Sequence, residues 1–67
     1  MMDAVILRCR RLMPDRPDRI WYEYAPLVNG RPKRRPTHMM ATVESASALA
    51  LRSGFTVHPD VINYRVP

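Results

Sequence analysis

The chain has 67 residues, eleven Lys and Arg against six Asp and Glu, and a formal net charge of +5 at pH 7. A chain of this length forms one domain and buries only about 60 % of its unfolded surface. It leaves no room for an enclosed substrate pocket of the usual ~300–1,000 Å³, which argues against an ordinary enzyme. Ten of the eleven cations are arginine, whose planar guanidinium suits phosphate and carboxylate groups, so the charge favours an acidic partner over a merely solvated surface.

The single cysteine and the amino-terminal residues predict a compartment. Cys9 stands alone, so we expect neither a disulfide within the chain nor a cysteine-based zinc cluster, which favours a reducing cytoplasm. The apolar run Ala4–Leu7 is followed by three arginines, the wrong charge order for a signal peptide, and it is far short of the ~20 residues of a membrane span. We expect a cytoplasmic protein with no membrane partner and no cofactor.

Residues 4–13 predict the first strand. Apolar side chains occupy alternate positions on one side of it, namely Val5, Leu7, Cys9 and Met13. The other side carries Ile6, Arg8 and Arg10. This period of two is typical of a strand with one buried face. The strand should end at Pro14, because residues 14–19 repeat a Pro-Asp-Arg triplet and proline disfavours regular structure, which predicts a loop.

Residues 20–24, Ile-Trp-Tyr-Glu-Tyr, predict the second strand, because aromatic residues favour strands and Pro26 should interrupt the pattern. Asn29-Gly30 predicts a turn, since both residues tolerate positive φ. The following stretch, 31–36, places four cations between two prolines with no apolar residue to bury. We therefore expect residues 29–36 to form an exposed basic arm, kept extended by proline and by self-repulsion.

The remaining residues predict a strand, a helix and a strand. Residues 37–43 alternate and predict the third strand. Ser45 should cap a helix over 46–53 that ends at Gly54 and packs on the sheet through Ala46, Leu49 and Ala50. Phe55 should plug the end of the sheet. His58-Pro59-Asp60 predicts a turn, and residues 61–66 predict the last strand, with Ile62, Tyr64 and Val66 on one side.

These elements predict an α+β fold in the order β-β-β-α-β. The simplest architecture is a small antiparallel sheet of three to four strands with one helix packed on one face. The opposite face would lie open to solvent and could carry Arg8, Arg10 and some of the aromatic side chains. An exposed sheet edge on so small a chain is also compatible with a homodimer.

Catalytic and metal-binding sets are weak in this sequence. Cys9 could in principle act with His38 or His58, but it lies on the apolar side of its strand, where an inert thiol is expected. The same three residues lack the close ligand spacing of structural zinc sites. The acids are scattered and the two glycines form no phosphate-binding loop. We expect neither catalysis nor a metal.

The basic arm is the strongest candidate for binding a partner. Its cations, Arg31, Lys33, Arg34 and Arg35, would form one positive patch with Arg8 and Arg10 if the first two strands pair. Trp21 is expected in the core, and it would be the best anchor for a partner if it pointed outward. Two partners compete: a protein or nucleoprotein whose carboxylates pair with arginine, and a nucleic acid held through its phosphates.

Residues 41–55, Ala-Thr-Val-Glu-Ser-Ala-Ser-Ala-Leu-Ala-Leu-Arg-Ser-Gly-Phe, resemble the strand-to-helix stretch of small phage-encoded inhibitors, including certain anti-CRISPR proteins. The resemblance covers about a quarter of the chain and concerns layout alone. It implies a stoichiometric inhibitor that docks on a host nucleoprotein, and it assigns a role to no residue. Because this chain is basic, mimicry of DNA is excluded. The sequence thus favours a non-enzymatic accessory protein, the alternative being a nucleic-acid-binding protein that contacts phosphates through residues 31–35.

Overall fold

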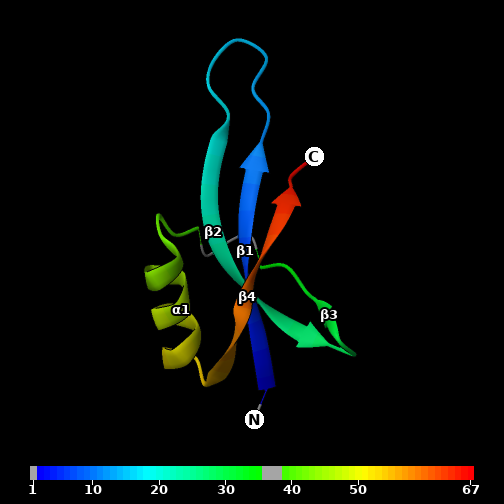
Figure 1. Ribbon diagram of the computed structural model, residues 1–67, viewed down its shortest axis with the longest axis vertical. Helices are drawn as coiled ribbons and strands as arrows, with labels where there is room; N and C mark the ends of the chain where they lie inside the picture. The colour runs from blue at the N-terminus through cyan, green and yellow to red at the C-terminus, as the bar shows by residue number, and fades with distance from the viewer. Residues whose placement is uncertain (1, 36–38) are drawn as a thin grey trace.

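A sheet of four strands with one helix on one of its faces makes up the fold (Figure 1). The computed structural model describes residues 2–35 and 39–67. The elements in chain order are β1 (Met2–Arg11), β2 (Arg19–Val28), β3 (Arg31–Pro32), α1 (Val43–Arg52) and β4 (Phe55–Arg65). The predicted α+β class, with one helix on a small sheet, is confirmed.

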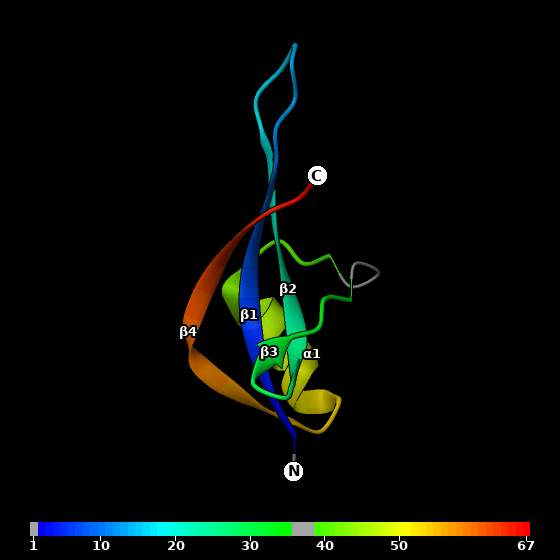
Figure 2. The same cartoon turned by 90° about the vertical axis from the view of Figure 1, so that its right-hand side faces the viewer.

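The sheet is mixed, in the order β3-β2-β1-β4. β1 and β2 form an antiparallel hairpin, in which Cys9 lies opposite Trp21. β4, in contrast, runs parallel to β1, because the chain crosses the sheet through α1 before it returns. The antiparallel pairing expected from the sequence therefore holds for β1, β2 and β3, whereas β4 is parallel to its neighbour β1. The hairpin extends beyond α1 and β4 in both views (Figures 1 and 2).

Proline interrupts two strands less than its chemistry suggests. β2 continues through Pro26. The backbone carbonyl of Pro26 points away from β1 and accepts from Lys33 N at 2.7 Å. The nitrogen of Pro26 is on the same side, so its missing N–H costs no hydrogen bond between β1 and β2. β4 continues through Pro59, where the register with β1 shifts between Ala4 and Ile6. The turn expected at 58–60 is thus a bulge in an edge strand, the setting in which a sheet tolerates proline.

The third strand expected at 37–43 is wrong. β3 is Arg31–Pro32 instead, and Met40 makes a single bridge to Tyr22, with both N–H···O bonds at 2.8 Å. Thr37 and His38 lie outside the described residues. Extended structure stops at residue 42 because Thr42 caps α1: its side chain accepts from Ser45 N at 3.0 Å.

The helix therefore begins three residues earlier than expected, at Val43, and Thr42 rather than Ser45 is its cap. Its end agrees with the sequence, since Gly54 has a φ of +89°, which favours glycine. Ala46 and Ala50 are fully buried against the sheet, together with Ala4, Ile6 and Tyr24. Small alanines let the helix axis approach the strands closely, and larger side chains such as Leu49 and Phe55 surround this contact.

The face of the sheet opposite α1 is also apolar and buried, contrary to the expectation that it would be open. Its cluster contains Val5, Leu7, Cys9, Trp21, Ala25 and Val66, with Leu27 packed against it. Arg8 and Arg10 are on the other face, in the same alternation as Ala4 and Ile6. Alternation correctly separated these two sets, but both sides of β1 are buried over residues 4–7.

Candidate functional site

The basic arm is held onto the protein by Arg34. Its Nε and Nη2 atoms donate to the two carboxylate oxygens of Glu23, each at 3.0 Å. Glu23 is fully buried, and its carboxylate also accepts from Trp21 Nε1 at 2.5 Å. The guanidinium lies over the ring of Tyr64 on β4, 5.3 Å from its centroid. Arg34 therefore fastens residues 31–35 across the face opposite α1, and its charge is compensated inside the molecule.

Arg34 and the neighbouring thiol of Cys9 are unsuited to proton transfer at neutral pH. Hydrogen bonding to Glu23 raises the pKa of Arg34. Burial, followed by the charge of Glu23, raises the pKa of the Cys9 thiol to about 11. A thiol with so high a pKa is protonated and poorly nucleophilic near pH 7.

The structure separates the two halves of the positive patch that the sequence suggested. Arg31, Lys33 and Arg35 are exposed, and their charged groups have no acidic partner among the described residues. They lie at and beyond β3, beside the end of β2 that is remote from its hairpin loop. Arg8 and Arg10 lie on the α1 face of β1, towards the hairpin loop. The arm and these two arginines form no single surface.

Trp21 is a core residue, with 5 % of its surface exposed, and is not available as an anchor. The guanidinium groups of Arg11 and Arg19 lie over its ring, 5.6 Å and 5.8 Å from the centroid. Because Arg11 and Arg19 are opposite each other in the hairpin, they cover the indole from two strands. A cation–π contact of an exposed guanidinium contributes about 0.5–1 kcal/mol.

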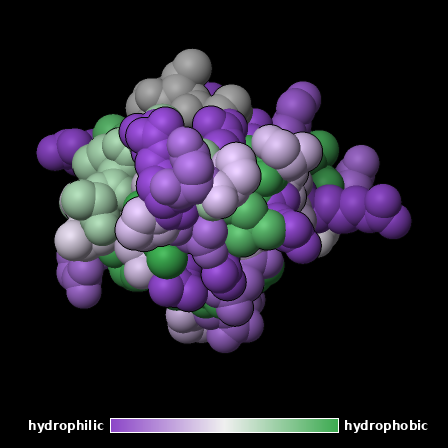
Figure 3. Space-filling view, turned by 90° about the horizontal axis from the view of Figure 1, so that it is seen from above, coloured by the Kyte–Doolittle hydropathy of each residue, from purple (hydrophilic) through white to green (hydrophobic). Residues whose placement is uncertain are grey.

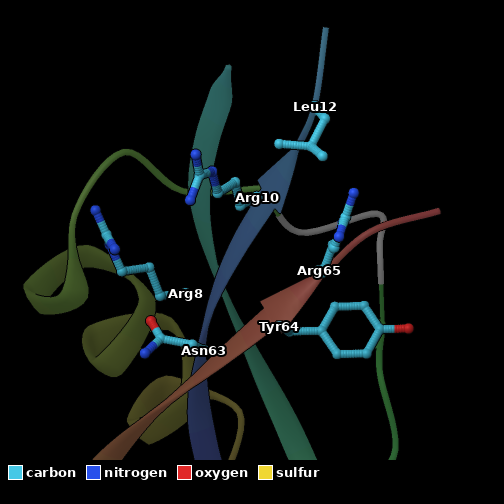
Figure 4. Close-up of a pocket in the computed structure, with 6 residues that line it drawn as sticks. All are labelled: Arg8, Arg10, Leu12, Asn63, Tyr64 and Arg65. Atoms are coloured by element: carbon cyan, nitrogen blue, oxygen red, sulfur yellow. The ribbon is translucent and has the colours of Figure 1, made fainter.

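An open groove of about 600 Å³ lies where α1 no longer covers its face of the sheet. Its lining comes from the ends of β1 and β4 and consists of Arg8, Arg10, Leu12, Asn63, Tyr64 and Arg65 (Figure 4). The parallel register places Asn63 beside Arg8 and Arg65 beside Arg10, so three arginines of two adjacent strands line the groove. Seen from the hairpin end, the molecule is mostly hydrophilic (Figure 3).

The three arginines of this groove differ in their partners. Arg10 donates from Nε to Asp18 Oδ2 at 2.8 Å and also pairs with it through Nη2. This hydrogen bonding lowers the pKa of Asp18, and the charge of Arg65 lowers it further. Within the described part of the chain, the guanidinium groups of Arg8 and Arg65 have neither hydrogen bond nor ion pair. The groove therefore carries uncompensated positive charge.

Asn63, Tyr64 and Arg65 were missed as site residues by sequence reasoning. Alternation did place Tyr64 on one side of the last strand, but the position of Asn63 and Arg65 beside Arg8 and Arg10 depends on the parallel register. No local pattern in the sequence specifies that register, because it is set by the crossover through α1.

Metal binding finds no support in the part of the chain that the structure covers. Over residues 2–35 and 39–67, no three His, Cys, Asp or Glu side chains are close enough to hold an ion. His38, one of the three weighed as ligands, lies outside the described residues. His58 instead stabilises the bulge of β4, where its Nδ1 accepts from Asp60 N at 3.2 Å.

No family of proteins, no curated protein and no solved structure was found to match this chain. In the described residues, the helix is too short and too polar to cross a membrane. The exposed chemistry of the groove and the arm is therefore the basis on which a function can be assigned.

Proposed function

We propose that this chain is a non-enzymatic accessory protein that binds a nucleoprotein or a nucleic acid through its cationic groove. The observation that carries this proposal is that Arg8, Arg10 and Arg65 line one open groove, two of them without an acidic partner among the described residues. Like charges that lie close together repel one another, so their clustering is favourable when an anion binds between them.

The lining of the groove supports binding rather than catalysis. Arginine stays protonated at neutral pH and cannot act as a general base, and Leu12 and Asn63 supply neither a nucleophile nor an acid. The groove is open to solvent, whereas catalytic sites exclude water from the reacting groups. Its volume falls within the ~300–1,000 Å³ range of ligand pockets, but its walls come from a sheet surface rather than from a closed cavity.

Phosphate is a better match than carboxylate for several arginines on a flat surface. A strand of nucleic acid offers a row of anions that adjacent guanidinium groups can contact together, and each contact releases counterions. Acidic protein surfaces remain the alternative partner, in which single Arg–carboxylate pairs would form at the rim of an interface. A stoichiometric inhibitor of a host nucleoprotein, the kind that residues 41–55 resemble, is one form of the proposed function.

Affinity purification from the cells that express the chain tests the proposal. The tagged protein should retain nucleic acid or a nucleoprotein, and the double variant Arg8→Gln/Arg65→Gln should retain much less at equal expression. A matched control is Arg31→Gln/Arg35→Gln, which removes the same charge from the arm. Equal retention by the parent and the groove variant, or retention of protein alone that nuclease and salt leave unchanged, would contradict a groove that binds nucleic acid.

A further inference from the structure

We infer that the groove binds nucleic acid through successive phosphates of one strand, with Asp18 as an internal competitor for Arg10. The inference rests on the proposed function and names the ligand of the same groove. Its first support is the spacing of the cations. Arg8 and Arg10 are two positions apart on β1, and thus about 6.8 Å along the strand. That distance is comparable with the separation of successive phosphates in an extended strand.

The second support is the third cation of the groove. The parallel register sets Arg65 of β4 beside Arg10, and neither Arg8 nor Arg65 has an acidic partner among the described residues. Leu12 adds an apolar side chain to the lining, with 43 % of its surface exposed. The Tyr64 ring lies on the opposite face, where the Arg34 guanidinium covers it, and Figure 4 shows it pointing away from Arg8.

The third support is the pairing of Arg10 with Asp18; Figure 4 shows Arg10 between Arg8 and Arg65 in the lining of the groove. Asp18 belongs to the hairpin connection between β1 and β2, and it accepts from the guanidinium at the groove. A phosphate can take the place of that carboxylate, because both groups present oxygen atoms to the same fork of N–H donors. The carboxylate thus holds Arg10 near the groove in the unbound protein and weakens the binding of isolated anions.

The test is fluorescence anisotropy with a labelled single strand of about 12 nucleotides, within the ~4–16 that a small domain covers. The unlabelled duplex of the same sequence and polyglutamate serve as competitors. Arg8→Gln/Arg65→Gln should weaken binding at least about tenfold and make the slope of log K against log salt shallower by roughly 1.4, at ~0.7 per contact. Arg31→Gln/Arg35→Gln, with the same loss of charge, should leave the slope unchanged. Circular dichroism melts should show that all variants fold.

Each contrary outcome identifies the part that is wrong. Failure of both the duplex and the unlabelled single strand to compete would overturn the phosphate contacts. Equal competition by polyglutamate would replace nucleic acid with an acidic protein as the partner. If the arm variant loses binding and the groove variant keeps it, the groove is refuted while the proposed function stands. If the parent binds none of the three polyanions, both fail.

Discussion

Glu23 and Arg34 are joined by two hydrogen bonds of 3.0 Å, and this pair determines where the basic arm lies. The carboxylate is fully buried, whereas 23 % of the Arg34 side chain is exposed. A buried carboxylate must be compensated, because transfer of an unpaired charge from water is costly. Arg34 is therefore a structural residue that lies beside Cys9 and Glu23, while its neighbours Arg31, Lys33 and Arg35 are exposed.

Replacement of Arg34 by Gln should destabilise the protein by about 3–5 kcal/mol, because it leaves the Glu23 carboxylate buried with a single donor. Urea or thermal unfolding, followed by tryptophan fluorescence, measures the loss. The control is Arg35→Gln, which removes the same charge from an exposed neighbour and should change stability by less than about 0.5 kcal/mol. Equal stability of the two variants would show that Glu23 is compensated in another way.

The double variant Glu23→Gln/Arg34→Gln separates the pair from the rest of the arm. It removes both charges, so it should be more stable than Arg34→Gln alone. A double variant that is less stable than Arg34→Gln would mean that Glu23 contributes mainly through Trp21, whose Nε1 donates to it.

The Cys9 thiol should make stability fall at alkaline pH. Its pKa is about 11 in the folded protein, against 9.0 ordinarily, so between these values the unfolded chain binds fewer protons than the folded one. The free energy of unfolding should therefore decrease as pH rises from about 9 to 11, by up to ~1.4 kcal/mol per pH unit. The measurement is urea unfolding across this range for the parent and Cys9→Ala. The two proteins differ only in this thiol, so parallel pH profiles would contradict a raised Cys9 pKa.

Leu49 and Leu51 of α1 form a matched pair for the helix contact. Leu49 packs against the α1-side core, whereas 61 % of the Leu51 surface is exposed. Leu49→Asp should cost at least about 2 kcal/mol, since it removes apolar contacts and brings a charge to the sheet. Leu51→Asp should cost less than about 1 kcal/mol, in line with helix propensity. Similar melting temperatures of the two variants would place the wrong side of α1 on the sheet.

Thr42→Ala should destabilise the helix by about 1 kcal/mol, because it removes the acceptor for the Ser45 backbone N–H. Ser45→Ala should cost less, since among the described residues its side chain bonds only to Thr42, and its loss leaves the cap in place. Thermal melts of both variants measure the difference. A larger effect at Ser45 would restore that residue as the cap and the helix start that the sequence suggested.

The parts of the fold that follow from local chemistry could be predicted from the sequence. Alternation in β1, the aromatic run in β2 and Gly54 after α1 each report on their own neighbourhood. The start of α1 was ambiguous, because Thr42 and Ser45 are both good caps and only one can be used. Pro26 and Pro59 were misread for a similar reason. The cost of a proline depends on whether its missing N–H would face a neighbouring strand, which a single segment does not reveal.

The candidate site was less predictable, because both of its defining features involve residues that are distant in the chain. The burial of Arg34 requires Glu23 to face the side of the sheet opposite α1. The groove requires β4 to run parallel to β1 so that Arg65 reaches Arg10. Composition indicated that the surface would be basic, but the choice between arm and groove depends on where the six acids lie.

Asp18→Asn should increase affinity for a single-stranded oligonucleotide, because it removes the carboxylate that a phosphate must displace from Arg10. An exposed pair of this kind is weak, so the expected gain is about two- to fivefold. Asp15→Asn is the control: it changes the net charge equally, and its oxygen is 4.0 Å from Arg16 Nε in an exposed position. Anisotropy titrations at several salt concentrations compare the two variants. An equal gain in both would reflect net charge alone, and Asp18 would then have no specific part in the groove.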